Sequence, residues 1–185
     1  MIYKIIEKRG PKRPKYIFLE NVDRLLSSPA KQRGRDMAVI LSSLQNQGYV
    51  VEWRVINAAD YGMPQRRRRV FIIGYHKTTK IYKQIKKLKK PFSWILKDGA
   101  IASSFPVTIK KGFTENDFLL SDDFIMVSDE FNKGKKTSPF QNSGIMIGDR
   151  VYTVKTIPQY DGPYKTLGQH LIPDNKDGLI LQQNQ

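Results

Sequence analysis

The pattern of apolar and polar residues predicts five regular elements in the first 75 residues. Apolar side chains recur at helical spacing in residues 1–9 and 34–47, which predicts two amphipathic helices. Residues 16–19 are a short apolar run, residues 49–56 alternate and residues 70–74 are again apolar, so we expect three strands. An unbroken apolar run is typical of a strand buried on both faces, as in a parallel sheet. The order of the elements therefore predicts the closing half of a doubly wound α/β sheet.

The rest of the chain has a different pattern. Residues 76–90 contain many lysines around a thin apolar stripe, which predicts a basic linker or a surface helix. From Pro91 onward, glycines and prolines divide short mixed segments, as in a small, irregular, β-rich or loop-rich region. The predicted organisation is a half sheet in residues 1–75, a basic linker in residues 76–91 and a second region in residues 92–185.

The formal net charge is +15, and its distribution is uneven. Residues 1–91 carry 22 lysines and arginines against 6 aspartates and glutamates, whereas residues 92–185 carry 10 against 11. A basic excess confined to one half is expected of a surface that faces a polyanion. For the lysine-dense residues 76–90 we favour a solvated surface over a dedicated DNA-contacting helix.

Composition excludes several kinds of site. The sequence has no cysteine, which excludes disulfides, thiolate metal sites and a cysteine nucleophile within these 185 residues. His76 and His170 are far apart and not at metal-ligand spacing, so we expect no metal site. A hydrophobic content of 39% indicates a folded protein. No apolar run approaches membrane-spanning length, so we expect no membrane partner and a cytoplasmic, nucleoid-associated location.

The sequence INAADYGMPQRRRRVFIIG places four consecutive arginines directly before an apolar strand. Side chains alternate between the faces of a strand, so Gln65, Arg67 and Arg69 are expected on one face. Arg66 and Arg68 are expected on the other face. Guanidinium groups match phosphates and base edges in bidentate geometry, which predicts a nucleic-acid site. The alternative is a solvated basic loop with loose ion pairs.

Glu20 and Asn21 follow the first predicted strand without a spacer. In open α/β sheets, ligands bind at the carboxyl ends of the strands, so a carboxylate at this point is a candidate functional group. The alternative is that Glu20 caps the next helix or pairs with a nearby arginine.

Three segments in this order, PKYIFLENVDRLL, SPAKQRGRD and INAADYGMPQRRRRVFIIG, resemble the C5-cytosine DNA methyltransferase family. The first and last contain residues of two family motifs: ENV at Glu20, Asn21 and Val22, and Gln-x-Arg-x-Arg at Gln65, Arg67 and Arg69. The resemblance implies that residues 1–75 are the C-terminal half of a Rossmann-like methyltransferase domain. Residues 92–185 are similar to the start of a target recognition domain, which implies a small, irregular, β-rich region.

The resemblance also implies a mechanism. In this family a cysteine thiolate attacks C6 of a flipped cytosine, and C5 then takes a methyl group from S-adenosylmethionine. Glu20 would contact N3 and the exocyclic amine, because a partly buried carboxyl can donate to a ring nitrogen. Asn21 would hold the local backbone. Arg69 would approach the base O2 and orient Glu20, and Arg67 would contribute to the same pocket or to the DNA backbone.

Double-stranded DNA is the implied partner. Gln65, Arg66 and Arg68 are assigned to DNA binding, with structural ion pairs as the favoured alternative for the two arginines. The family's Gly-rich cofactor loop, the acidic residues that hold the ribose and the Pro-Cys motif are not found in this sequence. No cofactor-binding residue is therefore assigned here, and the S-adenosylmethionine site is expected mostly outside this chain.

These gaps predict a part of a restriction-modification methyltransferase that is inactive alone. Its nucleophile and cofactor loop would come from a complementary polypeptide, or were lost through truncation. Two alternatives remain, namely a non-enzymatic basic DNA-binding module and an inert remnant.

Overall fold

The computed structural model describes residues 2–169, which form a layered structure of helices and strands. Its centre is a six-stranded sheet in the order β1-β3-β2-β6-β7-β5, with a two-stranded sheet of β4 and β8 beside it. The strands are β1 (Tyr16–Val22), β2 (Tyr49–Asn57), β3 (Arg68–His76), β4 (Val107–Ile109), β5 (Asn116–Leu119), β6 (Ser143–Ile147), β7 (Arg150–Val154) and β8 (Thr156–Pro158). Every strand pair within the described residues is antiparallel.

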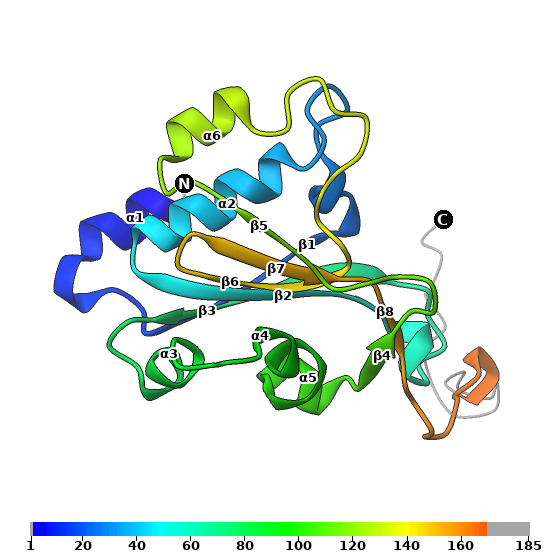
Figure 1. The fold of residues 1–185 in the computed structure, drawn as a ribbon. Helices are drawn as coiled ribbons and strands as arrows, with labels where there is room; N and C mark the ends of the chain where they lie inside the picture. Colours follow the sequence, from blue (N-terminus) through cyan, green and yellow to red (C-terminus); the bar gives the residue numbers. More distant parts are fainter. Residues whose placement is uncertain (1, 170–185) are drawn as a thin grey trace, which may run out of the picture.

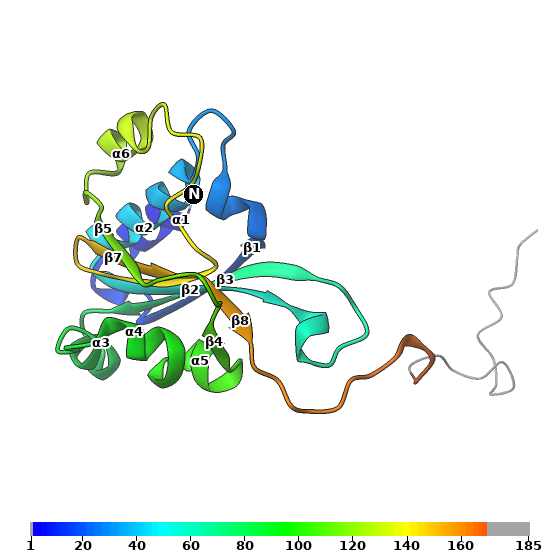
Figure 2. The same cartoon turned by 45° about the vertical axis from the view of Figure 1, so that its right-hand side comes forward.

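Helices cover both faces of the large sheet (Figure 1 and Figure 2). One face carries α1 (Ile2–Arg9), α2 (Arg35–Asn46) and α6 (Phe124–Glu130), and the other carries α3 (Lys80–Ile85), α4 (Pro91–Ser93) and α5 (Ala100–Ser104). Short helical turns join these elements: η1 (Gly10–Lys12), η2 (Asp23–Ser27), η3 (Ala58–Tyr61), η4 (Trp94–Asp98) and η5 (Leu167–Gln169). The mixed α/β class and the five elements expected in the first 75 residues are present.

The prediction of a doubly buried, parallel strand at residues 16–19 is wrong. β1 pairs antiparallel with β3, and Ile17 is its one fully buried side chain. Phe18 is 66% exposed. The run is apolar without being buried on both faces because β1 lies at the edge of the sheet, where side chains facing away from α2 are largely uncovered.

The second half of the chain continues the same sheet. β6 pairs with β2 and places Gly144 opposite Trp53. A Cβ atom on Gly144 would lie 2.1 Å from the Trp53 indole, so only glycine lets the ring cross the neighbouring strand. The indole Nε1 donates a hydrogen bond to the Gln141 carbonyl at 3.1 Å. The predicted boundaries at residues 75 and 91 therefore do not coincide with a break in the sheet.

The expected basic linker after β3 is part of the packed structure. Thr79 caps α3, because its hydroxyl accepts the Tyr82 N–H at 3.1 Å. Ile85 at the end of α3 is fully buried in a cluster with Trp94 and Ile145. The lysines of this segment face solvent, as a surface helix requires.

The main core lies between the sheet and α2. Met37 and Leu41 of α2 are fully buried against Trp53, Ile72 and Val151 of the sheet. These contacts fix α2 against the sheet at β2, and α2 also contacts η2, the turn that follows β1.

Two charged side chains of β2 are buried on the opposite face of the sheet. Arg54 is 2% exposed and donates to the carbonyls of Phe105, at 2.6 Å, and Ile95. Glu52 is 3% exposed and accepts a hydrogen bond from the Tyr75 hydroxyl. Arg54 thereby ties the segment that precedes β4 to the centre of the sheet.

Candidate functional site

The end of β1 and the start of β3 lie side by side. Their register places Val22 opposite Arg69 and Glu20 opposite Phe71, so Glu20 and Arg69 are diagonal neighbours on one face. Arg69 Nε lies 2.8 Å from Glu20 Oε1, and Arg67 Nη2 lies 3.5 Å from the same oxygen. The structure thus brings three of the predicted site residues to one point.

These three side chains remain accessible. The side chain of Glu20 is 41% exposed, that of Arg69 25% and that of Arg67 51%. Exposed ion pairs contribute only about 0–1 kcal/mol, so a ligand can compete for the same groups at little cost. Both arginines engage Oε1, and no hydrogen bond or ion pair reaches Oε2 from the part of the chain that the structure describes.

The other predicted DNA-binding residues lie around this point without joining it. Arg68 Nη2 lies 3.2 Å from Asp23 Oδ2, at the start of η2, so Arg68 makes a structural ion pair on the other side of its strand. Gln65 and Arg66 are exposed, and neither side chain has a hydrogen bond or ion pair within residues 2–169. Arg68 thus makes an ion pair, as the alternative interpretation of this residue expects, whereas Arg66 is exposed to solvent.

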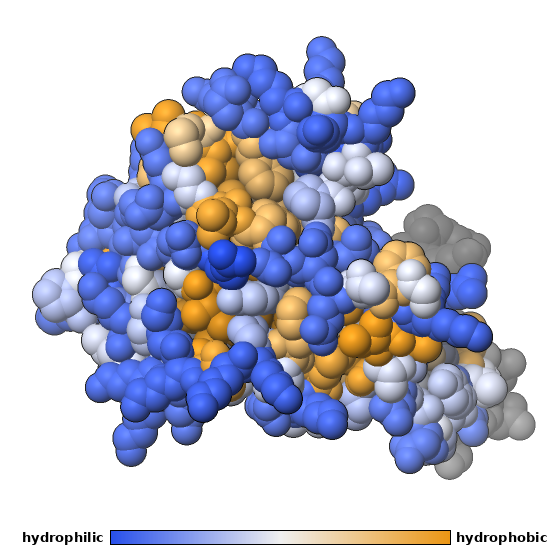
Figure 3. All heavy atoms as spheres, viewed as in Figure 1, coloured by the Kyte–Doolittle hydropathy of each residue, from blue (hydrophilic) through white to orange (hydrophobic). Residues whose placement is uncertain are grey.

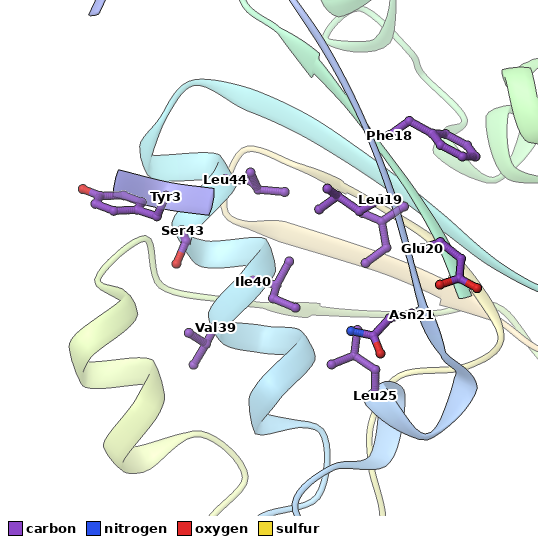
Figure 4. A pocket seen from close by; sticks show the side chains of 11 residues that line it. Tyr3, Phe18, Leu19, Glu20, Asn21, Leu25, Val39, Ile40, Ser43 and Leu44 are labelled. Atoms are coloured by element: carbon purple, nitrogen blue, oxygen red, sulfur yellow. The ribbon is translucent and has the colours of Figure 1, made fainter. Parts of the chain in front are cut away.

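Asn21 fixes the backbone where β1 passes into η2, because its Oδ1 accepts the Val22 N–H at 2.8 Å. Figure 4 shows Leu19 and Asn21 on the α2 side of β1, with Phe18 and Glu20 on the opposite side. A largely apolar cavity of about 570 Å³ opens along β1 and α2 and reaches Glu20. The candidate site therefore combines a carboxylate, two guanidinium groups and adjoining apolar surface.

The turn before the arginines is held by a distant segment, residues 159–165, which we call the strap. Gly62 has φ +83°, and a Cβ atom there would lie 2.4 Å from the Pro163 carbonyl oxygen. The Lys165 N–H donates to the Gly62 carbonyl at 2.8 Å. Tyr61 packs against the ring of Tyr160 with 5.9 Å between centroids. No local pattern in the sequence links these two segments.

The histidines do not join the site. His76 lies at the far end of β3, and burial, together with Arg13 and Lys77, lowers its pKa. His170 lies outside the described residues. Within residues 2–169, no three His, Cys, Asp or Glu side chains are placed to hold a metal ion, and no helix is long and apolar enough to cross a membrane.

Comparison with known proteins agrees with the motifs. A family model for C-5 cytosine-specific DNA methylases matches residues 1–178. Type II methyltransferase M.Sau3AI of Staphylococcus aureus is 45% identical over 174 residues, which are 93% of this chain and 40% of that protein. Type II methyltransferase M.NlaIV of Neisseria lactamica is 43% identical over 67 residues, 34% of this chain and 16% of that protein. The chain thus spans less than half the length of these relatives. Because the family model matches nearly all of the sequence, the chain belongs to the C-5 cytosine-specific DNA methylase family.

Proposed function

We propose that this chain is one part of a DNA (cytosine-5-)-methyltransferase of a restriction-modification system, which acts on double-stranded DNA in the cytoplasm. The observation that carries the proposal is the contact of Glu20 with Arg69 and Arg67 at the accessible end of β1. Family membership and the Type II methyltransferases among the relatives support the reaction class.

Glu20 binds the target cytosine in this proposal. The arginines occupy Oε1, so Oε2 is left to accept a hydrogen bond from the exocyclic amine, with the carboxyl next to N3. Arg69 donates from Nη1 to the Arg68 carbonyl at 2.7 Å, which holds its guanidinium group beside Glu20. The fixed positive charge would stabilise the negative charge that develops on the ring when the nucleophile adds to C6.

The surrounding cations bind the DNA backbone in this proposal. Arg66 is exposed and extends the basic surface from the turn, and the exposed, uncharged Gln65 adds a hydrogen-bonding group beside it. Arg67 is half exposed and contributes both to the base pocket and to the backbone. Arg68 can contact a phosphate only if it gives up its ion pair with Asp23. We therefore propose that its main role is to stabilise the fold.

S-adenosylmethionine supplies the methyl group in the proposed reaction, and the described residues do not fit its site. The cavity beside β1 offers one carboxylate, that of Glu20, which already contacts two arginines. No second acidic side chain lines this cavity to bind the ribose hydroxyls. We therefore assign the cofactor site mostly to residues outside this chain and derive no role in cofactor binding for residues within it.

The strand directions in the sheet also support a catalytic domain that is shared between this chain and further residues. β1 and β2 both run antiparallel to β3, so β1 and β2 are parallel to each other. We interpret these strands as the C-terminal half of a Rossmann-like sheet, in which further strands of the complete enzyme pair with the outer edge of β1. Residues 92–185 remain our proposed partial target recognition domain, although β5, β6 and β7 continue the same sheet.

The sequence contains no cysteine, so the nucleophile of the proposed reaction comes from residues outside it. We propose a complementary polypeptide with a Pro-Cys motif and a Gly-rich loop. The test is transfer of tritiated methyl groups to duplex DNA by the purified chain, alone and mixed with the part of M.Sau3AI that has no counterpart here. We expect activity only in the mixture. Activity of the chain alone, or none in a mixture that forms a complex, would contradict the proposal.

A basic DNA-binding module without chemistry is the second candidate, favoured by the net charge of +15 and by the exposed Arg66. Substitution separates the two candidates. In a binding module, Glu20→Gln changes nothing, while Arg67→Ala and Arg69→Ala weaken DNA binding. In a methyltransferase part, Glu20→Gln lowers methylation by the mixture and leaves DNA binding intact.

A further inference from the structure

Two lysines face each other across the small sheet. The Lys110 N–H donates to the Lys155 carbonyl at 2.9 Å, one position beyond the pairing of Ile109 with Thr156. The two side chains are therefore cross-strand neighbours, and like charges in that position destabilise a sheet. Within residues 2–169 neither ammonium group lies within ion-pair distance of a carboxylate. Lys110 Nζ instead lies 5.5 Å from the centre of the Phe113 ring.

The lysine pair lies beside the arginine turn. The Pro106 carbonyl, just before β4, accepts hydrogen bonds from the Gln159 N–H at 2.9 Å and from the Tyr61 hydroxyl at 3.2 Å. These bonds join β4, the strap and η3. Figure 1 and Figure 2 show β4 and β8 next to the end of the β2–β3 hairpin, with α3 at the opposite end of the sheet.

The charges around the pair are also positive. Burial lowers the pKa of Lys155 most, and the nearby charges of Lys110 and Arg68 lower it further. An anion placed beside Lys110 and Lys155 would offset the repulsion between them, whereas Arg68 already has a partner in Asp23 at 3.2 Å. The strap adds the exposed Lys165, whose backbone is bonded to Gly62, and the exposed Tyr164.

We propose that Lys110 and Lys155 bind phosphates of a DNA duplex whose target base lies at Glu20. This inference rests on the proposed function and adds a second contact surface, on β4 and β8, to the arginine turn. A duplex is the occupant that supplies several phosphates in a row along one surface. The sequence alone places these lysines in the half of the chain that has almost no net charge, and the fold brings them next to Arg68.

The test is the salt dependence of binding of the full chain to a fluorescein-labelled DNA duplex, measured by anisotropy. Log affinity falls by about 0.9 per log salt for each phosphate contact, so Lys110→Gln with Lys155→Gln reduces the slope by about 1.8. Between 50 and 200 mM salt, wild type then loses about 12-fold more affinity than the double variant. The matched control is Lys83→Gln with Lys87→Gln, which removes the same charge from exposed positions at the other end of the sheet.

An unchanged slope in the first double variant, or an equal reduction in the control, overturns the inference. So does tighter, equally lysine-dependent binding of an RNA duplex of the same sequence, because phosphates of another nucleic acid would then be the occupant. The double variant is expected to have a Tm at or above that of wild type, since it relieves repulsion. A lower Tm would mean that the two lysines stabilise the fold and do not serve DNA binding. If the slopes differ as expected but the mixture does not methylate, only the proposed function fails.

Discussion

Glu52 allows a direct test of how the buried charges of β2 act on the fold. Its carboxyl is 3% exposed, and the Tyr75 hydroxyl donates to it. Burial raises its pKa from 4.5 to about 6, although the bond from Tyr75 and the charge of Arg54 oppose the increase. The perturbation we consider is Glu52→Gln, which keeps the shape of the side chain and removes its titration.

The direction follows from the raised pKa. The folded protein holds this proton more tightly than the unfolded chain, so the contribution of Glu52 to stability is fully present below pH 4.5 and is lost as the pH rises through about 6. A difference of about 1.5 in pKa corresponds to about 2 kcal/mol between these limits. Glu52→Gln should therefore gain about 2 kcal/mol relative to wild type when the pH is raised across this range.

Urea unfolding of both proteins at a series of pH values from 4 to 8 measures this difference. The difference in unfolding free energy between Glu52→Gln and wild type should change only between pH 4.5 and pH 7. A constant difference would refute the reasoning, because Glu52 would then titrate alike in the folded and unfolded chains. A change of the opposite sign would mean that Arg54 and Tyr75 outweigh burial.

Three further substitutions follow from close contacts and from the site. Gly144→Ala should lower the unfolding free energy in urea by about 3 kcal/mol, because its Cβ would overlap the Trp53 ring; a loss below about 1 kcal/mol would contradict this packing. Gly62→Ala should lower the free energy of unfolding by about 1–2 kcal/mol and loosen the contact of the strap with the turn. Trypsin should then cleave faster after Lys165, and an unchanged cleavage rate would contradict this prediction. Arg69→Ala should lower methylation by the mixture about 10²–10³-fold, and a loss under 10-fold would argue against its role.

Local sequence patterns predicted the elements of the first 75 residues, because these elements depend on near neighbours. The helical stripe predicted in residues 34–47 corresponds to α2. The two motifs that contain Glu20 and Arg69 lie on neighbouring strands, and these two side chains are in contact. The parallel, doubly buried strand failed for a different reason. An apolar run indicates side chains that are suited to burial, but it does not indicate which strand pairs with it or whether both of its faces are covered.

Long-range contacts account for what the sequence did not reveal. In the pairing of β2 with β6, the Trp53 ring lies over Gly144, which is 91 positions away in the sequence. No local sequence pattern predicts such a pair. The strap contains a turn signal, Asp161-Gly162-Pro163, which predicts a reversal but not its neighbour at Gly62. Lys155 and Arg68 likewise lie in different halves of the chain, so the net charge of each half does not indicate that the fold brings them together.

The most direct measurement of the central claim compares two glutamate substitutions in this chain, each mixed with the part of M.Sau3AI that lies outside the matched region. Glu20→Gln and the control Glu115→Gln each remove one charge, and the Glu115 side chain is exposed and remote from β1 in sequence. Single-turnover methylation should fall about 10²–10⁴-fold for Glu20→Gln, the range of a general acid or base, and stay unchanged for Glu115→Gln. Equal rates for both variants would contradict the claim that Glu20 acts on the cytosine.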